Sequence, residues 1–114
     1  MKNQFDEVKF HNHVRALFIK PADVMGKTLH AAVGIAGEAG EILDCVKKTW
    51  IYGKELDVVN LVEEAGDVMF YLAALLDQQG YTLGQAAEMN YTKLAKRYPQ
   101  GYTDQAAQER ADKA

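Results

Sequence analysis

Cysteine, proline and long apolar runs are all scarce in this chain of 114 residues. Its single cysteine, Cys45, cannot form a disulfide within the chain and fits a reducing compartment, so we expect a cytoplasmic protein. No apolar run approaches the roughly 18 residues of a membrane span, and no secretion signal is recognisable. The formal net charge of −3 offers no general attraction for nucleic acid. We therefore expect neither a membrane nor a nucleic acid polymer as a partner.

Strand-like alternation of apolar and polar residues is also missing, whereas helical periodicity recurs along the chain. The sequence predicts an all-α protein with four helices joined by short connections. Thr28 is a plausible N-cap for the second helix, and either Asp57 or Asn60 for the third. Thr82 and Gln85 form a capping box for the fourth. We expect the helices at residues 3–18, at 28–50, from 58 or 61 (after a cap at Asp57 or Asn60) to Gly80, and at 82–98.

The organisation predicted from these elements is one helical domain over residues 1–102 followed by a polar tail over residues 103–114. The tail either frays or adds a short exposed helix. From Ala65 to Leu76 the third helix is nearly all apolar, with Asp67 as its only charge. A helix that is apolar all round is normally enclosed by neighbours, so we expect a homodimer or a homotetramer.

One short phrase occurs twice, 26 positions apart: Glu38–Leu43 is echoed by Glu64–Met69. Each copy places two carboxylates three residues apart around an Ala-Gly pair, and residues at this spacing share one face of a helix. A glycine within a helix costs about 1 kcal/mol relative to alanine. We therefore expect Gly40 and Gly66 to mark a close approach of the two helix backbones, which pack as an antiparallel hairpin.

Such a hairpin would gather four acids, Glu38, Glu41, Glu64 and Asp67. Like charges about 5 Å apart repel by about 3 kcal/mol at an effective dielectric of about 20, so the cluster must protonate, spread or bind cations. Carboxylate oxygens favour Mg²⁺ or Mn²⁺ over Zn²⁺, which prefers histidine and cysteine. We expect these four residues to be metal ligands. Glu63 points about 100° away on the helix, and a solvent-facing, a salt-bridged and a metal-linked Glu63 all remain open.

Several other polar residues are candidates for contacts with a substrate, each with a structural alternative. His30 lies two turns before Glu38 and either lines the same cleft or has a structural role. Lys47 and Lys48 either bind phosphate or complement the dipole at the C-terminal end of their helix. Asn90, Lys93 and Arg97 share one face of the fourth helix, which either binds phosphate oxygens or is a solvated stripe. The full set of candidates is His30, Lys47, Lys48, Asn90, Lys93 and Arg97.

With these motifs, the chain resembles the MazG-like, all-α nucleoside triphosphate pyrophosphohydrolases, which include the dimeric dUTPase relatives. The likeness covers residues 28–102 and rests on the segments 37–41 and 63–67. It is strengthened by His30, by the pair Lys47-Lys48, and by the closing segment 90–101, Asn-Tyr-Thr-Lys-Leu-Ala-Lys-Arg-Tyr-Pro-Gln-Gly. Many members begin the first motif with two adjacent acids, and Gly37 stands at the first of these positions. This departure bears on how many metal ions the site holds.

The resemblance implies a MazG-like helical bundle and Mg²⁺-dependent hydrolysis of a nucleoside triphosphate to the monophosphate and pyrophosphate. It implies Glu38, Glu41, Glu64 and Asp67 as metal ligands, with either Glu38 or Glu41 also accepting a proton from the attacking water. Lys93, with help from Arg97, Lys47 or Lys48, would stabilise the leaving pyrophosphate. Two alternatives are a non-catalytic helical interaction protein whose acids bind a cation, and a nucleotide sensor that binds without turnover.

Overall fold

The structure is a computed structural model that describes residues 4–113. Within this range every regular element is helical, so the prediction of an all-α fold is confirmed. The described chain contains five α-helices and a short 3-10 helix, against the four helices predicted. It divides into two compact units, and the boundary between them in the sequence falls between Thr82 and Leu83. None of the described helices is long and apolar enough to span a bilayer.

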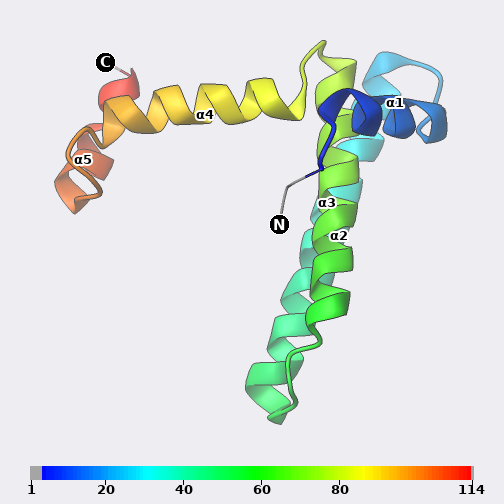
Figure 1. The fold of residues 1–114 in the computed structure, drawn as a ribbon, viewed down its shortest axis with the longest axis horizontal. Helices are drawn as coiled ribbons and strands as arrows, with labels where there is room; N and C mark the ends of the chain where they lie inside the picture. Colours follow the sequence, from blue (N-terminus) through cyan, green and yellow to red (C-terminus); the bar gives the residue numbers. More distant parts are fainter. Residues whose placement is uncertain (1–3, 114) are drawn as a thin grey trace. The chain divides into compact units, whose positions relative to one another are not determined.

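The first unit is built on a long helical hairpin, which Figure 1 shows as α2 and α3 running side by side. Helix α2 spans Val24–Tyr52 and ends at Gly53, whose φ of 66° is a left-handed conformation that favours glycine. Helix α3 spans Val58–Gln78, and a second left-handed glycine, Gly80, follows it. The connection is short, so the two helices run antiparallel, as predicted.

The helix starts show which capping residues the chain uses. The prediction of Thr28 as the N-cap of α2 was wrong. The cap is Asp23, whose side chain accepts a hydrogen bond from the backbone N–H of Gly26 at 2.8 Å, so the helix begins earlier. Thr28 lies one turn inside, where its hydroxyl donates to the carbonyl of Val24 at 2.8 Å. Of the two candidates for α3, Asp57 is the cap, and its carboxylate accepts from the N–H of Asn60 at 3.1 Å.

Small residues set the close packing between α2 and α3. Ala31 on α2 and Ala73 and Ala74 on α3 are almost fully buried. A Cβ atom added to Gly34 would lie 2.4 Å from the ring of Tyr71, so only glycine fits there. The α2 backbone therefore approaches α3 closely at Gly34, where it lies against the Tyr71 ring.

The expectation that Gly40 and Gly66 mark this approach was wrong. A Cβ atom on either one would meet nothing within 4 Å among the described residues. The reason is the helical period: each glycine follows its motif's first acid by two residues, or about 200° around the helix. If the acids face the partner helix, the glycines must face outward.

Helix α1, Glu7–Leu17, packs against this hairpin. It starts at the cap Asp6 and ends before Phe18; the predicted start, Asn3, lies outside the described residues. The Arg15 guanidinium forms a two-point ion pair with Asp77 on α3, with 3.0 Å between Arg15 Nε and Asp77 Oδ2. Phe18 is buried and stacks on His30 with 4.8 Å between ring centroids. These contacts secure the end of the hairpin opposite the α2–α3 turn.

Apolar residues on the outer sides of the hairpin remain exposed. On each helix they recur at steps of three and four residues, and Gly40 and Gly66 lie within the two rows. Trp50 on α2 is 84% exposed. We name these rows the outer stripes: Leu29, Val33, Ala36, Gly40 and Leu43 on α2, and Val59, Val62, Gly66 and Met69 on α3.

The second unit contains α4 (Leu83–Arg97), α5 (Asp104–Glu109) and the 3-10 helix η1 (Ala111–Lys113). Helix α4 ends one residue before the predicted end at Tyr98. The tail adds a short helix, the second of the two outcomes considered for it. It is also bound to α4, because Arg97 donates through Nε and Nη2 to the two carboxylate oxygens of Asp112, at 2.9 and 3.2 Å.

Candidate metal and phosphate site

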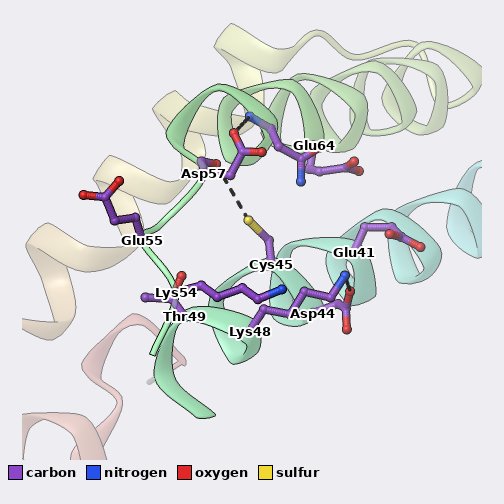
Figure 2. Close-up of a pocket in the computed structure, with 10 residues that line it drawn as sticks. Glu41, Asp44, Cys45, Lys48, Thr49, Lys54, Glu55, Asp57 and Glu64 are labelled. Atoms are coloured by element: carbon purple, nitrogen blue, oxygen red, sulfur yellow. Dashed lines mark hydrogen bonds and ion pairs between the residues drawn. The ribbon is translucent and has the colours of Figure 1, made fainter. Parts of the chain in front are cut away.

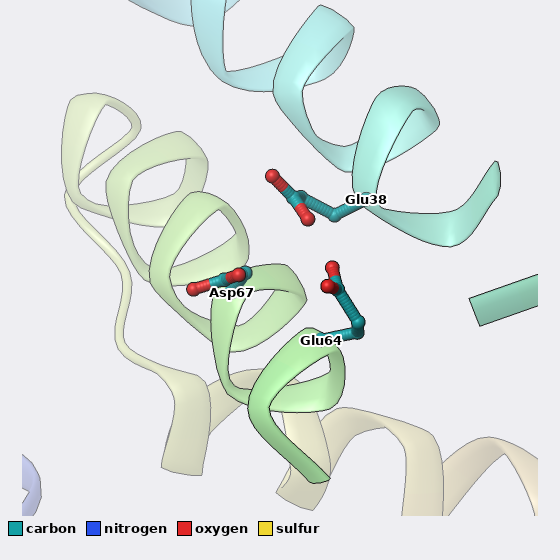
Figure 3. A group of neighbouring side chains, drawn as sticks. All are labelled: Glu38, Glu64 and Asp67. Carbon is teal, nitrogen blue, oxygen red and sulfur yellow. The ribbon is translucent and has the colours of Figure 1, made fainter. Parts of the chain in front are cut away.

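Three of the four predicted acidic ligands converge between α2 and α3. Glu38, Glu64 and Asp67 each offer one carboxylate oxygen, and these three atoms all lie within 4.8 Å of one another. Figure 3 shows Glu38 projecting from α2 towards Glu64 and Asp67 on α3. We call these three residues the acidic cluster.

The register of the hairpin explains why these residues meet. Gly34 on α2 packs against Tyr71 on α3. Because the helices run antiparallel, four residues forward along α2 correspond to four residues backward along α3. This step places Glu38 opposite Asp67, and Glu64 lies one turn from Asp67 on the same face. The tight fit at Gly34 thus sets the position of the cluster.

The electrostatics of the cluster are those of acids held close without a counter-charge. The pKa of Glu64 is raised, first by a hydrogen bond shared with the Glu38 carboxyl, then by burial and by repulsion from Glu38 and Asp67. Its Oε2 atom is buried and has no hydrogen-bond partner among the described residues. Within residues 4–113, no lysine or arginine forms an ion pair with these three acids. A buried carboxylate oxygen without a partner needs a proton or a cation.

A hard divalent cation fits this donor set. All three donors are carboxylate oxygens, the ligands that Mg²⁺ and Mn²⁺ prefer. The three atoms lie within 4.8 Å of one another, so rotation of the side chains could bring all of them into contact with one cation. The cluster could therefore hold the cation through Glu38, Glu64 and Asp67, with further positions left for water or a ligand.

Glu41, the fourth predicted ligand, lies outside this group of three. Its side chain is exposed and lines a neighbouring cavity of about 400 Å³ between the C-terminal part of α2 and the start of α3. Glu64 lines the same cavity and so belongs to both features. Figure 2 shows Glu41 and Glu64 on opposite helices at this cavity. The acids of the first motif therefore divide between the cluster and the cavity.

The sequence comparison identifies the family. The model of the MazG nucleotide pyrophosphohydrolase domain matches residues 27–102, two thirds of the chain. The chain belongs to this family. The match confirms the predicted resemblance and includes the acidic cluster and the residues lining the cavity.

A relative is found in Mycobacterium phage L5, whose Gene 37 protein is 35% identical over 79 residues. The alignment covers 63% of this chain and 67% of the phage protein. No solved structure matches the chain.

Two lysines follow the first motif of this MazG domain, and they differ in position. Lys48 lines the cavity, and its ammonium group lies 2.9 Å from the Asp44 carboxylate. That hydrogen bond raises the pKa of Lys48 and lowers the pKa of Asp44. Lys47 lies 3.9 Å from the same carboxylate and does not line the cavity. Of the pair, only Lys48 is placed to reach a ligand in the cavity.

The remaining predicted residues of the MazG domain have other surroundings. His30 Nδ1 lies 3.1 Å from the carbonyl of Lys20, and its ring stacks on Phe18, as in the structural interpretation of this residue. Glu63 is exposed and outside the cluster. In the second unit Asn90 is exposed, Lys93 is half-buried, and Arg97 is paired with Asp112. Their assignment to substrate binding stays a prediction.

Sequence reasoning missed four polar residues that line the cavity, Asp44, Thr49, Lys54 and Glu55, and two of them bear on ligand binding. Thr49 lies in the last turn of α2, and its Oγ1 atom is buried, with no hydrogen-bond partner within residues 4–113. Lys54 lies in the connection after Gly53. Neither belongs to a repeated motif, so only the folded hairpin reveals that they line one cavity with Glu64.

Proposed function

We propose that this MazG domain hydrolyses a nucleoside triphosphate to the nucleoside monophosphate and pyrophosphate, with Mg²⁺, or alternatively Mn²⁺, as the cofactor. The observation that carries the proposal is the acidic cluster, in which a buried oxygen of Glu64 has no hydrogen-bond partner among the residues that the structure describes. Family membership supplies the reaction class. The substrate would bind through its phosphates, since these complement a cation held by carboxylates.

The residues of the hairpin would divide the chemistry among them. Glu38, Glu64 and Asp67 would hold the cation, which when bound neutralises phosphate charge and polarises a phosphoryl oxygen. A water molecule attacks the α-phosphorus, the bond from that phosphorus to the α,β-bridging oxygen breaks, and pyrophosphate leaves. The proton released by the water passes to a carboxylate of the protein.

Glu41 is the better candidate for this proton acceptor. Sequence reasoning left Glu38 and Glu41 open, but Glu38 contributes its oxygen to the cluster, whereas Glu41 lies outside it. A carboxylate committed to a cation is a weaker base than one that is free. Glu41 also faces the cavity that Glu64 lines, so it lies beside the proposed cation site.

The outer stripes support a homodimer or a homotetramer. Their spacing of three and four residues is the spacing by which helices pack against partner helices. Gly40 and Gly66 lie within the stripes, where the absence of a side chain permits close approach of another backbone. A second copy of this chain is the partner we propose. Two stripes on different sides of the hairpin fit either assembly.

The test is turnover with identification of the product. Purified protein with Mg²⁺ should release pyrophosphate, and not orthophosphate, from at least one member of a panel of standard and modified nucleoside triphosphates. Glu41→Gln and Asp67→Asn should each abolish turnover while circular dichroism shows unchanged helix content. Release of orthophosphate alone would assign a different reaction, and metal-dependent stabilisation without turnover would indicate a binding protein.

A further inference from the structure

The cavity next to the acidic cluster has polar groups that the cation does not explain. It lies at the turn end of the hairpin and shares Glu64 with the cluster. Its volume of about 400 Å³ is within the range of small-ligand sites. The residues that matter for its chemistry are Glu41, Lys48, Thr49, Lys54 and Glu64.

Lys54 supplies a positive charge that is unpaired in the part of the chain that the structure describes. Within residues 4–113, no carboxylate lies within ion-pair distance of its ammonium group. Figure 2 shows its side chain reaching from the connecting loop towards Lys48. The fold thus adds the Lys54 ammonium group to a cavity that Lys48, paired with Asp44, also lines.

Two residues that line the cavity, Thr49 and Glu64, each carry a buried polar atom without a partner among residues 4–113. Thr49 Oγ1 can donate a hydrogen bond, and Glu64 Oε2 can accept one or bind a cation. A ligand that satisfies both must present acceptor oxygens on one side and a cation on the other. A phosphate group carrying a divalent cation has this pattern.

The other acids of the cavity favour a cation-complexed anion over a free one. Asp44 is neutralised by Lys48, and Asp57 is engaged in capping α3. Glu41 and Glu55 remain as uncompensated carboxylates. They would repel a free phosphate ion but tolerate one whose charge is largely neutralised by Mg²⁺.

We infer that the cavity holds the β- and γ-phosphates of the substrate as their Mg²⁺ complex, with Lys54, Lys48 and Thr49 as binding residues. The triphosphate then runs from the acidic cluster towards the α2–α3 turn, and the nucleoside lies on the far side of the cluster from that turn. This inference rests on the proposed function, which it deepens by giving the substrate a direction and a phosphate-binding residue, Lys54.

The experiment compares Lys54→Gln with the wild type in binding inorganic pyrophosphate at saturating Mg²⁺, measured by isothermal titration calorimetry. A charge-assisted hydrogen bond is worth enough that its loss weakens binding by about tenfold or more. Lys54→Arg, which keeps the charge, should restore most of the affinity. Thr49→Val, which removes the hydroxyl at nearly constant volume, should weaken binding less. Lys9→Gln removes the charge of an exposed lysine on α1. It is the matched control and should bind pyrophosphate like the wild type.

The direction of the substrate is tested by binding of nucleoside monophosphate to the same variants. Lys54→Gln should leave that affinity within about twofold while raising the KM of the triphosphate by about tenfold. Equal weakening of monophosphate and pyrophosphate would overturn the inferred direction. Unchanged pyrophosphate binding in Lys54→Gln, in a protein that still hydrolyses triphosphates, would overturn the inference and leave the proposed function intact. Loss of pyrophosphate binding in Lys54→Gln, when the wild type hydrolyses no nucleotide, would support the site and overturn the proposed function.

Discussion

The two copies of the Glu-Ala-Gly phrase begin with the same three residues and continue with similar ones, yet they differ in what they do in the fold. The copy on α3 contributes both of its acids, Glu64 and Asp67, to the acidic cluster. The copy on α2 contributes Glu38, while Glu41 lines the cavity. The difference shows that the role of a carboxylate here depends on what lies opposite it across the hairpin, and not on its place in the motif.

The largest effect is expected at Glu64, which belongs both to the acidic cluster and to the cavity lining. Glu64→Gln should reduce Mg²⁺ affinity and turnover each by at least about 100-fold, because loss of a ligand should exceed the 10- to 100-fold effect of losing a group that only orients one. Calorimetric titration with Mg²⁺ and a pyrophosphate-release assay measure the two effects. A variant that keeps near-normal metal binding would remove Glu64 from the cation site.

A substitution at Glu41 should affect turnover but not the binding of Mg²⁺. Glu41→Gln should lower kcat by about 100-fold or more, in the range lost with a general base, and leave Mg²⁺ affinity within about threefold. The same titration and assay are used, with Glu38→Gln as the comparison, which should lose both properties. If Glu41→Gln loses metal affinity as severely as Glu38→Gln, then Glu41 is a ligand and the two motif copies are equivalent after all.

A smaller effect is expected on stability in the absence of divalent cations. Because the folded pKa of Glu64 is raised above its ordinary 4.5, its charged form destabilises the fold at higher pH. In EDTA at pH 7, Glu64→Gln should therefore melt at a higher temperature than the wild type. The difference should shrink as pH falls through the raised pKa and vanish below about 4.5, as followed by circular dichroism. Glu88→Gln, an exposed change on α4, should show no such pH-dependent gain.

The smallest effects should distinguish the glycines. Gly34→Ala should destabilise the protein by about 1–3 kcal/mol, because its Cβ would meet the Tyr71 ring. Gly66→Ala should stabilise the isolated chain by up to about 1 kcal/mol, since its Cβ meets nothing and alanine favours the helix. Urea unfolding at low protein concentration measures both. If Gly66 lies against a second copy, the gain should disappear at concentrations where sedimentation shows the oligomer.

Local signals in the sequence were sufficient for much of the hairpin. Helical periodicity predicted the all-α class, and the acids at i and i+3 predicted the face that carries Glu64 and Asp67. The start of α2 was missed because Asp23 satisfies free N–H groups before Thr28 can. Asp23 and Thr28 are both residue types that favour the N-cap position, and the sequence alone did not decide between them.

Contacts between distant residues were beyond the sequence. The ion pair between Arg97 and Asp112 joins a helix to a tail segment, and no periodicity links them. Lys54 lies in the α2–α3 connection and belongs to no repeated motif. Its proposed role in binding depends on the cavity between the two helices, which the sequence alone does not reveal. The roles of Gly40 and Gly66 were misjudged because a shared motif suggested contact, whereas their angular position on the helix turns them outward.

Cys45 gives this architecture a practical use in chemical biology. It is the chain's one thiol; it is mostly buried, and it lines the same cavity as Lys54 and Thr49. A phosphate mimic carrying a mild electrophile would be delivered next to that sulfur and would label a single position. Covalent capture could then trap the domain with its cavity filled, without any engineered cysteine.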